Sequence, residues 1–407
     1  MRERYIISIV DENFDILLQA QDYLFLDMTR TENSVGALII RLPIRYDSLL
    51  RNLGLLESIS AAISMPRFFI HVYQCLLGNS GCCLWEDAVW IIDKPARVLE
   101  EDGNCYIQLE AADQMELLNY RSVYADEDSP FAERTGAADT VMHQVFVDQF
   151  GDAQGLDPRR DWIAGGCVAD GIDPSCGFSP YEQRLEFKGT LLKIFQDAAK
   201  ASTTNNLPLF FDLVPTLIPT QFGSRASLPL VFNTYCGHRS TDRTVNNPDG
   251  NTAVMLSTQT GTIGSFTIGP DFRSDHSVAM AVGSGSGASQ PRQIRVNDVR
   301  VDSTKWGWKE SITTDRDAED QTDVDASADE YLEEGKSRGQ LIVELTDSPA
   351  VRYGMPDCGG NFRWGDCITI CDETTAINVR IVAVNITIED GDLKRVIKLE
   401  VTDEQPE

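Results

Sequence analysis

The residues that look most capable of chemistry lie in one short stretch, T-Y-C-G-H-R-S-T-D-R, at 234–243. It places Cys236 two positions before His238. A cysteine nucleophile needs a base in hydrogen-bond reach, and the two usually come from separate parts of a sequence. No known nucleophile motif surrounds this pair. We therefore predict no catalytic residue in this stretch.

The other candidates for acid–base chemistry give no stronger signal. His71 falls in an expected strand and His143 on an expected helix, so we interpret both as structural; His276 is the fourth histidine. The 63 acidic residues are too many to single out a catalytic pair. No H-E-x-x-H or glycosidase pattern occurs. The sequence therefore predicts a protein that is not an enzyme and that has no cofactor.

The ten cysteines do not follow the spacing of a metal site. No C-x-x-C pair occurs, and neither the pair Cys167 and Cys176 nor the group Cys358, Cys367 and Cys371 has zinc-ligand spacing. We predict no metal site and interpret the cysteines as small buried residues. Disulfides are expected only in an oxidising compartment.

Two further stretches imitate ligand loops without completing them. The run G-S-G-S-G at 283–287 lacks the Lys-Ser/Thr of a phosphate-binding loop, and no helix is expected after it, so we interpret it as an exposed flexible loop. The acidic stretch 313–338 spaces its aspartates as a calcium loop does, but it lacks the required glycine and glutamate. A solvated helix that ends at Gly335 fits this stretch better.

Strands dominate the C-terminal end. Alternating apolar residues predict strands at 367–370, 377–388 and 396–401, with a slip at Ile381–Val382 that is typical of a β-bulge. The polar turn 389–392 contains Gly391 and joins the last two strands. So few strands cannot bury two faces alone, and we expect the N-terminus to supply the remaining sheet.

The rest of the chain divides into a β-rich beginning and a mixed middle. Strand patterns occur at 5–10, 16–18, 23–26, 37–43, 68–74, 88–95 and 106–112. They predict an antiparallel barrel or sandwich over 1–118. Helical spacing at 135–149 and 189–202, and strand patterns at 209–214 and 230–235, predict an α+β middle region over 119–343, with two possible subdomains. Residues 344–407 form the third predicted domain, which is barrel-like.

Composition narrows the function classes. At 407 residues the chain is expected to form two to four domains, and no apolar run is long enough for a transmembrane helix. No signal peptide is recognisable, so we expect synthesis and assembly in a cytosol. The net charge of −28 excludes nucleic-acid binding through phosphate neutralisation. An acidic surface could nevertheless let DNA pass without sticking.

Several pieces of the sequence, in order, match a known pattern. They are L-L-N-Y-R-S-V-Y at 117–124, T-G-A-A-D-T-V-M at 135–142, L-L-K-I-F-Q-D-A-A at 191–199, P-L-F-F-D at 208–212, T-Y-C-G-H-R-S-T-D-R at 234–243, Y-G at 353–354 and W-G-D at 364–366. This ordered set resembles the siphovirus Gp37-like tail protein family, over about 115–400. The family looks related to the tail or baseplate hub of phages.

The resemblance implies an α+β, mostly β fold in which two β-barrel (tail-tube-like) domains from the chain ends flank an inserted α+β region. It implies a homotrimer whose six barrels join the six-fold tail tube to a three-fold tip and let DNA through. The implied partners are a tail tube or distal tail protein above, a tail-tip, spike or fibre protein below, and a tape measure protein. The implied location is the tail tip or baseplate of the virion, assembled in the host cytoplasm.

Three alternatives compete with the hub. The first is a tail-associated peptidase or glycosidase, against which the lack of a catalytic motif speaks. The second is a receptor- or carbohydrate-binding tail-tip protein, in which Trp306 and Trp308 would stack on sugar rings; packing in a core or subunit contact is the competing interpretation. The third is a hexameric distal tail protein.

Overall fold

The computed structural model describes most of the chain. The described residues are 4–11, 16–20, 22–53, 56, 68–78, 81–85, 88–123, 133–151, 176–184, 189–215, 230–237, 240–271, 275–285, 290–303, 307–314, 321–335, 338–346, 352–354, 360–371, 376–389 and 394–403. Two compact units result. Unit 1 comprises Met1–Ser202, Leu207–Phe266 and Ile342–Glu407, and unit 2 comprises Thr203–Asn206 and Thr267–Leu341.

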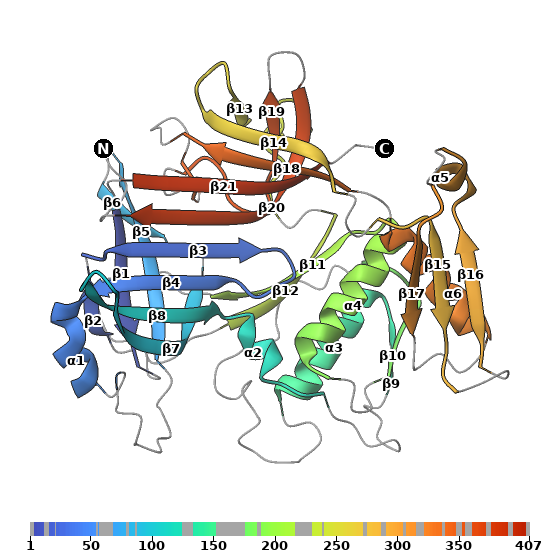
Figure 1. Cartoon of the computed structure of the whole chain (residues 1–407), viewed down its shortest axis with the longest axis horizontal. Helices are drawn as coiled ribbons and strands as arrows, with labels where there is room; N and C mark the ends of the chain where they lie inside the picture. Colours follow the sequence, from blue (N-terminus) through green and yellow to red (C-terminus); the bar gives the residue numbers. More distant parts are fainter. Residues whose placement is uncertain are drawn as a thin grey trace. The chain divides into compact units, whose positions relative to one another are not determined.

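Unit 1 is built on a 14-stranded sheet (Figure 1). Its main path runs in the order β14 (Ile263–Asp271), β18 (Arg338–Leu345), β21 (Lys394–Asp403), β20 (Ala376–Glu389), β3 (Phe25–Thr31), β4 (Ala37–Pro43), β8 (Cys105–Asp113), β7 (Val89–Leu99), β5 (Phe69–Gly78), β1 (Arg4–Val10) and β2 (Ile16–Ala20). Beside this path, β19 (Cys367–Cys371) pairs with β20 and, in parallel, with β13 (Met255–Ser257), and β6 (Gly81–Trp85) pairs with β5.

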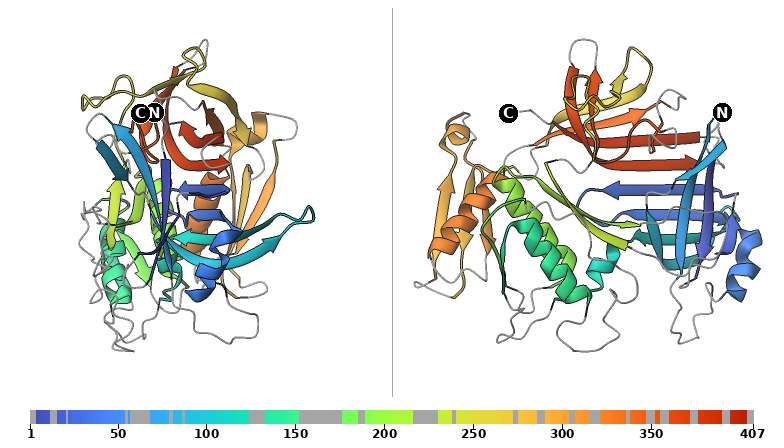
Figure 2. Two further views of the ribbon diagram at one scale, coloured as in Figure 1. Left: turned by 90° about the vertical axis from the view of Figure 1, so that its left-hand side faces the viewer. Right: turned by 180° about the vertical axis from the view of Figure 1, so that it is seen from behind.

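The two ends of the chain meet in the middle of this sheet. Strand β20 pairs antiparallel with β3 from Ala383–Thr31 to Glu389–Phe25, and β21 pairs with the other edge of β20. The red and blue strands therefore lie side by side in Figures 1 and 2. The expectation that the N-terminus completes the C-terminal strands is confirmed. So is the predicted bulge, because the register of β20 with β21 shifts between Ile381 and Ala383.

Alternating apolar residues explain why these segments are strands. In β4 the buried residues Leu38, Ile40 and Leu42 alternate with partly exposed or exposed ones, as a sheet with one covered face requires. The predicted N-terminal strands are found within a few residues of their expected bounds, and β1 and β2 pair antiparallel as a hairpin. Short helical segments at η1 (Ile44–Tyr46) and α1 (Asp47–Asn52) follow β4 and were not predicted.

A layer of helices and hairpins completes unit 1. It contains α2 (Glu116–Asn119), α3 (Ala138–Phe150), α4 (Leu191–Thr204), the hairpin β9 (Glu133–Gly136) with β10 (Tyr181–Arg184) and the hairpin β11 (Leu209–Pro215) with β12 (Leu230–Cys236). Both long helices and the two strands β11 and β12 agree with the sequence predictions. Helices α3 and α4 lie side by side (Figures 1 and 2).

One hydrophobic core holds this layer together, and we call it the helical core. Its buried members come from α2, α3, α4, β11 and β12, and they include Leu118, Met142, Phe146, Leu191, Phe195, Phe211 and Phe232. Phe232 lies at its centre, with ring centroids 4.7 Å from Phe146 and 4.9 Å from Phe195. The sequence pieces at 117–124, 135–142, 191–199 and 208–212 therefore contribute to one core.

Unit 2 is a small α/β layer. Strands β16 (Arg292–Val296), β15 (Val278–Val282) and β17 (Glu310–Thr314) form a sheet in that order, with β15 and β17 parallel. Helix α6 (Gln321–Glu334) covers one face through Val324 and Ala328, which pack on Ala281. The acidic helix that was predicted to end at Gly335 is confirmed; α5 (Asp298–Ser303) is an additional short helix.

The predicted fold class is therefore confirmed at the level of a mostly β protein with helices. The described strands from both chain ends instead pair along one open path in a single sheet. The prediction of separate barrels from residues 1–118 and 344–407 is therefore wrong for the described residues, because β20 and β3 join the two ends edge to edge. The division at residues 118 and 343 stays a prediction.

Candidate functional site

The outer edge of β11 is bonded to side chains instead of to another strand. Asn33, in the turn between β3 and β4, donates from Nδ2 to the Leu209 carbonyl at 3.1 Å and accepts from the Phe211 N–H at 2.9 Å through Oδ1. Its amide thus does what a peptide group of a neighbouring strand would do. Asn33 has a φ of 52°, a left-handed conformation that asparagine tolerates better than most residues.

Two residues directly after β8, Gln114 and Met115, contact the next main-chain groups along the β11 edge. Gln114 donates to the Leu213 carbonyl at 2.6 Å and accepts from the Val89 N–H at 3.0 Å. The sulfur of Met115 lies 3.3 Å from the Leu213 nitrogen. Because buried main-chain groups must be bonded, these contacts fix β11 beside the β3–β4 turn and the last residues of β8.

Beside this edge lies a buried group of charges. Arg30 on β3 is paired with Asp113 at the end of β8, and its second terminal nitrogen lies 3.6 Å from Asp212 on β11. The guanidinium also lies over the indole of Trp364, 4.8 Å from the ring centroid. All four side chains are buried. One cation, two carboxylates and an aromatic face therefore connect four distant segments of sequence.

Burial dominates the electrostatics of this group. It raises the pKa of Asp113 to about 6, against the opposing pull of Arg30 and with a further upward contribution from Asp212. A buried carboxyl with a raised pKa is a common mark of a functional site, but ion-pair networks that serve structure produce the same shift. Here the charges are covered on all sides by the chain, which favours the structural interpretation.

The turn at 364–366 contains another buried carboxylate that is paired with an arginine. Asp366 is fully buried and accepts hydrogen bonds from the N–H groups of Thr241 and Arg363 and from Nε of Arg243, each at 3.0 Å. Main-chain bonds run alongside: the Arg243 N–H donates to the Cys367 carbonyl, and the Cys367 N–H donates to the Thr241 carbonyl. Gly365 has a φ of +84°, so the turn between Trp364 and Asp366 uses a conformation that glycine adopts easily.

We call these six residues the charged junction: Arg30, Asp113, Asp212, Trp364, Asp366 and Arg243. It joins three of the sequence pieces noted above, P-L-F-F-D, T-Y-C-G-H-R-S-T-D-R and W-G-D, which are far apart in the chain. The sequence predicted no site residues, and it gave no indication that Arg30 and Asp113 would join these pieces.

The stretch around Cys236 has a different role from the one its composition suggested. Cys236 forms a disulfide with Cys176, so the interpretation of these two cysteines as unpaired buried residues is wrong. The pairing links the end of β12 to the segment before β10, and a local pattern cannot show such a contact. His238 lies outside the described residues. Its pairing with Cys236 therefore stays untested.

The described histidines lie in packed surroundings. His143 Nε2 is 3.0 Å from Thr234 Oγ1, and its ring stands edge-on to Phe232. A Thr–His pair can act as nucleophile and base, but both residues are buried in the helical core. His71 is buried beside Tyr73, and His276 Nε2 is 2.8 Å from the Tyr331 carbonyl oxygen.

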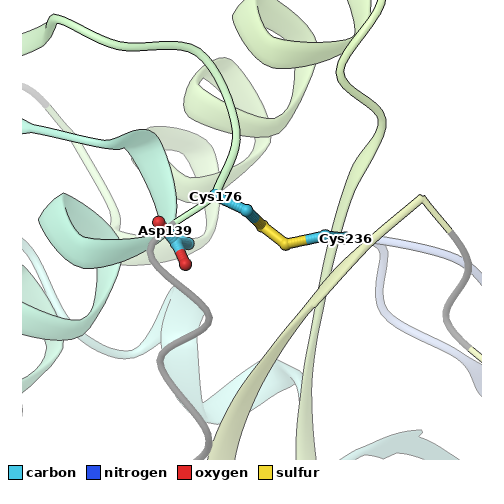
Figure 3. A group of neighbouring side chains, drawn as sticks. All are labelled: Asp139, Cys176 and Cys236. Carbon is cyan, nitrogen blue, oxygen red and sulfur yellow. A yellow bond between two sulfur atoms is a disulfide. The ribbon is translucent and has the colours of Figure 1, made fainter.

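One group of side chains has the geometry of a metal site. The ligand atoms of Asp139, Cys176 and Cys236 lie within 4.8 Å of one another (Figure 3). Asp139 is buried in the first turn of α3, and the two sulfur atoms are joined as a disulfide. In this form the sulfurs cannot act as thiolate ligands. The group was not predicted because its members lie on three separate elements.

Comparison with known structures identifies the fold. The chain superposes on the 43 kDa tail protein of prophage MuSo2 from Shewanella oneidensis with a TM-score of 0.53 and 11% identity, covering 98% of both chains. It matches the tail protein from Neisseria meningitidis MC58 with a TM-score of 0.54 and 11% identity, covering 98% of this chain and 97% of that one. The chain shares the fold of these two tail proteins.

Sequence comparison adds no assignment. No protein-family model matches the chain, and no curated protein matches its sequence. The resemblance to the siphovirus Gp37-like family is therefore a hypothesis from short pieces of sequence. Within the described residues, no helix is long and apolar enough to cross a membrane.

Proposed function

We propose that this protein is a structural component of a phage tail, namely the hub that joins the tail tube to the tail tip. The observation that carries the proposal is the similarity in fold to two tail proteins over nearly the whole length of all three chains. A match of that extent includes both the large sheet and the inserted helical layer. It thus covers more than a common β-sheet motif would.

The finer assignments belong to the same proposal. The chain would be a member of the siphovirus Gp37-like family and would form a homotrimer in the virion. A tail tube or distal tail protein would bind on the tube side of this hub, and a tip, spike or fibre protein on the other side. A tape measure protein would also contact it. The charged junction supports this role, because it braces the sheet against the helical layer and presents no open reactive group.

A closed ring of three chains would have two consequences, one for the interfaces and one for the charge. Three heterologous interfaces that close on themselves leave no sticky surface from which a filament could grow. A net charge of −28 would make an acidic lumen that repels DNA phosphates, so the genome could slide through.

The test is class averaging of the purified protein by negative-stain electron microscopy, with the mass in solution measured in parallel. We expect a three-fold ring with a central hole and the mass of a trimer. A six-fold ring would favour a distal tail protein instead. A monomer that stays a monomer when tube protein is added would contradict the hub.

A second candidate has one supporting observation. Trp308 is 55% exposed, as a residue that stacks on sugar rings should be, and its indole N–H donates to Glu310 at 2.6 Å. Trp306 lies outside the described residues. A receptor- or carbohydrate-binding role at the tail tip therefore predicts glycan-array hits that Trp308→Ala abolishes. An array without hits would remove this candidate.

A further inference from the structure

We propose that Cys176, Cys236 and Asp139 bind a zinc ion when the two cysteines are reduced. Nothing in the tail-protein assignment requires this site, and the proposal does not depend on that assignment. It rests on where three ligands lie, on how the chain holds them and on the chemistry of the donor atoms.

The positions suit both a disulfide and a metal. The Cα atoms of Cys176 and Cys236 are 6.2 Å apart. Two thiolates on one tetrahedral zinc ion stand about 3.7 Å apart, since each Zn–S bond is about 2.3 Å. Rotating the cysteine side chains about their Cα–Cβ bonds is enough to open the sulfurs to that separation. The Asp139 carboxylate already lies within 4.8 Å of both sulfurs (Figure 3).

Contacts other than the disulfide hold the three segments together. The N–H groups of Ala138 and Asp139 donate to the carbonyls of Phe178 and Cys176, at 3.0 and 3.4 Å. Strand β12, which ends at Cys236, packs on α3 through Phe232 and Phe146, whose ring centroids are 4.7 Å apart. These contacts do not depend on the disulfide, so reduction would leave the ligands close together.

Each cysteine is followed by a glycine in the left-handed conformation. Gly177 has a φ of +84° and Gly237 a φ of +72°. A Cβ on Gly177 would lie only 3.0 Å from Ser202 Oγ and 3.2 Å from Leu209, so this turn is also closely packed.

The chemistry of the three ligand atoms determines which metal ion would bind. Two thiolates and a carboxylate are a soft to borderline set, which favours Zn²⁺ over the oxygen-seeking Mg²⁺ and Ca²⁺. Their three negative charges would meet between a buried carboxylate, a partly buried thiolate and an exposed thiolate, and a divalent cation would offset most of their mutual repulsion. A water molecule completes the tetrahedron. In a reducing compartment zinc would thus fasten α3 to β12, as the disulfide does in an oxidising one.

The experiment uses the full chain in both redox states. Under anaerobic conditions tris(2-carboxyethyl)phosphine reduces the disulfide: two electrons pass to the sulfurs, giving two thiols, and the phosphine takes oxygen from water to become its oxide. Zinc affinity is then measured by competition with a chromophoric chelator. Co²⁺ serves as a spectroscopic substitute, because thiolate ligands give it a charge-transfer band.

Three variants make the result specific. Cys236→Ser removes one thiolate, and Asp139→Asn removes the carboxylate but retains the disulfide and most of the side-chain volume. Cys371→Ser is the matched control, since Cys371 is a free, partly buried cysteine of β19. We expect reduced wild type and Cys371→Ser to bind one zinc ion alike. We expect Asp139→Asn to bind at least about a hundredfold more weakly, because even second-shell changes cost ten- to a hundredfold.

The outcomes are decisive in either direction. Oxidised wild type should lack this zinc ion, and the cobalt charge-transfer band of the reduced protein should weaken in Cys236→Ser. Equal affinity in reduced wild type, Cys236→Ser and Asp139→Asn would overturn the proposal, since any bound zinc would then belong to other cysteines. Should Cys236→Ser fail to fold, as judged by circular dichroism, the Asp139→Asn result decides alone.

Discussion

The helical core and the charged junction hold unit 1 together in opposite ways. In the helical core, aromatic and aliphatic side chains exclude water and contact many neighbours, and Phe232 alone lies near four aromatic rings. In the charged junction, Arg30 must satisfy Asp113 and Asp212 and still pack on Trp364. The helical core is stabilised by the apolar surface that it removes from water. In the charged junction, the ion pairs must first offset the cost of removing charges from water.

This difference predicts different responses to mutation. An apolar core tolerates changes of shape if volume is kept, so its variants lose stability in proportion to the atoms removed. A buried ion network tolerates the loss of all its charges better than the loss of one. Unfolding by denaturant, measured on matched variants, separates the two cases.

The largest effect is expected for Phe232→Ala. The side chain is fully buried, and its removal leaves a cavity between Phe146 and Phe195. We expect the free energy of unfolding to fall by about 3–5 kcal/mol, as for other buried phenylalanines. Phe232→Leu should cost distinctly less, because it keeps most of the volume. Equal losses for the two variants would show that volume is not what this position supplies.

The next effect is expected for Arg30→Met, which keeps the apolar stem and removes the guanidinium. It leaves two buried carboxylates without their cation, and we expect a loss of about 3 kcal/mol, the low end for a broken buried pair. The low end applies because Asp113 can take up a proton. Adding Asp113→Asn to this variant should restore part of the stability.

A matched surface pair gives the contrast. Lys193 and Asp197 form an exposed ion pair on α4, with side chains 63% and 43% exposed. Lys193→Met should change the free energy of unfolding by less than about 0.5 kcal/mol. If Arg30→Met changes the free energy of unfolding as little as Lys193→Met does, then the buried ion pairs of the charged junction contribute no more to stability than an exposed pair.

The two regions also differ in how far the sequence predicts them. Helical spacing at 135–149 and 189–202 identifies α3 and α4, and an apolar face on a helix must be buried, so the helical core follows from local pattern. The charged junction does not. Arg30 and Asp113 lie 83 residues apart, just beyond the predicted strand stretches 23–26 and 106–112, and nothing in the local sequences T-R-T and A-A-D indicates that these two charges pair. The partner of Asn33, 178 residues away at Phe211, is equally invisible.

Long-range covalent and edge contacts escaped prediction for the same reason. The disulfide spans 60 residues, and pattern shows where a cysteine lies in its own element but not what faces it. The pairing of the chain ends was predictable because an incomplete sheet needs more strands. That argument gives the partner but not the register, which β20 and β3 set through their full run of contacts.

The pH dependence of stability sharpens the comparison further. The pKa of Asp113 is raised to about 6 in the folded protein, mainly by burial, against about 3.9 in an unfolded chain. The folded state therefore holds this proton more tightly. The protonated Asp113 carboxyl therefore contributes to the free energy of unfolding. This contribution is complete below about pH 4 and is lost as the pH rises to about 6, a change on the order of 2–3 kcal/mol.

Other carboxyl groups titrate in the same range, so the measurement is a difference. The stability of wild type minus that of Asp113→Asn should decrease between pH 4 and pH 6.5. Glu110→Gln is the control of opposite sign, because the hydrogen bond from Gln108 lowers the pKa of Glu110, and its stabilisation is lost as the pH falls. A difference for Asp113→Asn that stays constant with pH would mean that Asp113 is ionised throughout.

Among the buried contacts, the smallest effect is expected at Asn33, where a neutral side chain takes the place of a neighbouring strand. Asn33→Ala removes two hydrogen bonds to β11, each with a net contribution of about 1 kcal/mol, and leaves the Leu209 carbonyl and the Phe211 N–H to find other partners. We expect a loss of about 2 kcal/mol. Asn33→Asp keeps the acceptor for Phe211 but loses the donor to Leu209, so it should fall between wild type and alanine. Asn33→Gly keeps the left-handed turn but makes neither bond, and hydrogen exchange at the Phe211 amide should then rise as much as in Asn33→Ala. Protection at Phe211 that survives both substitutions would show that β11 is held by its other contacts and that the edge does not depend on the Asn33 amide.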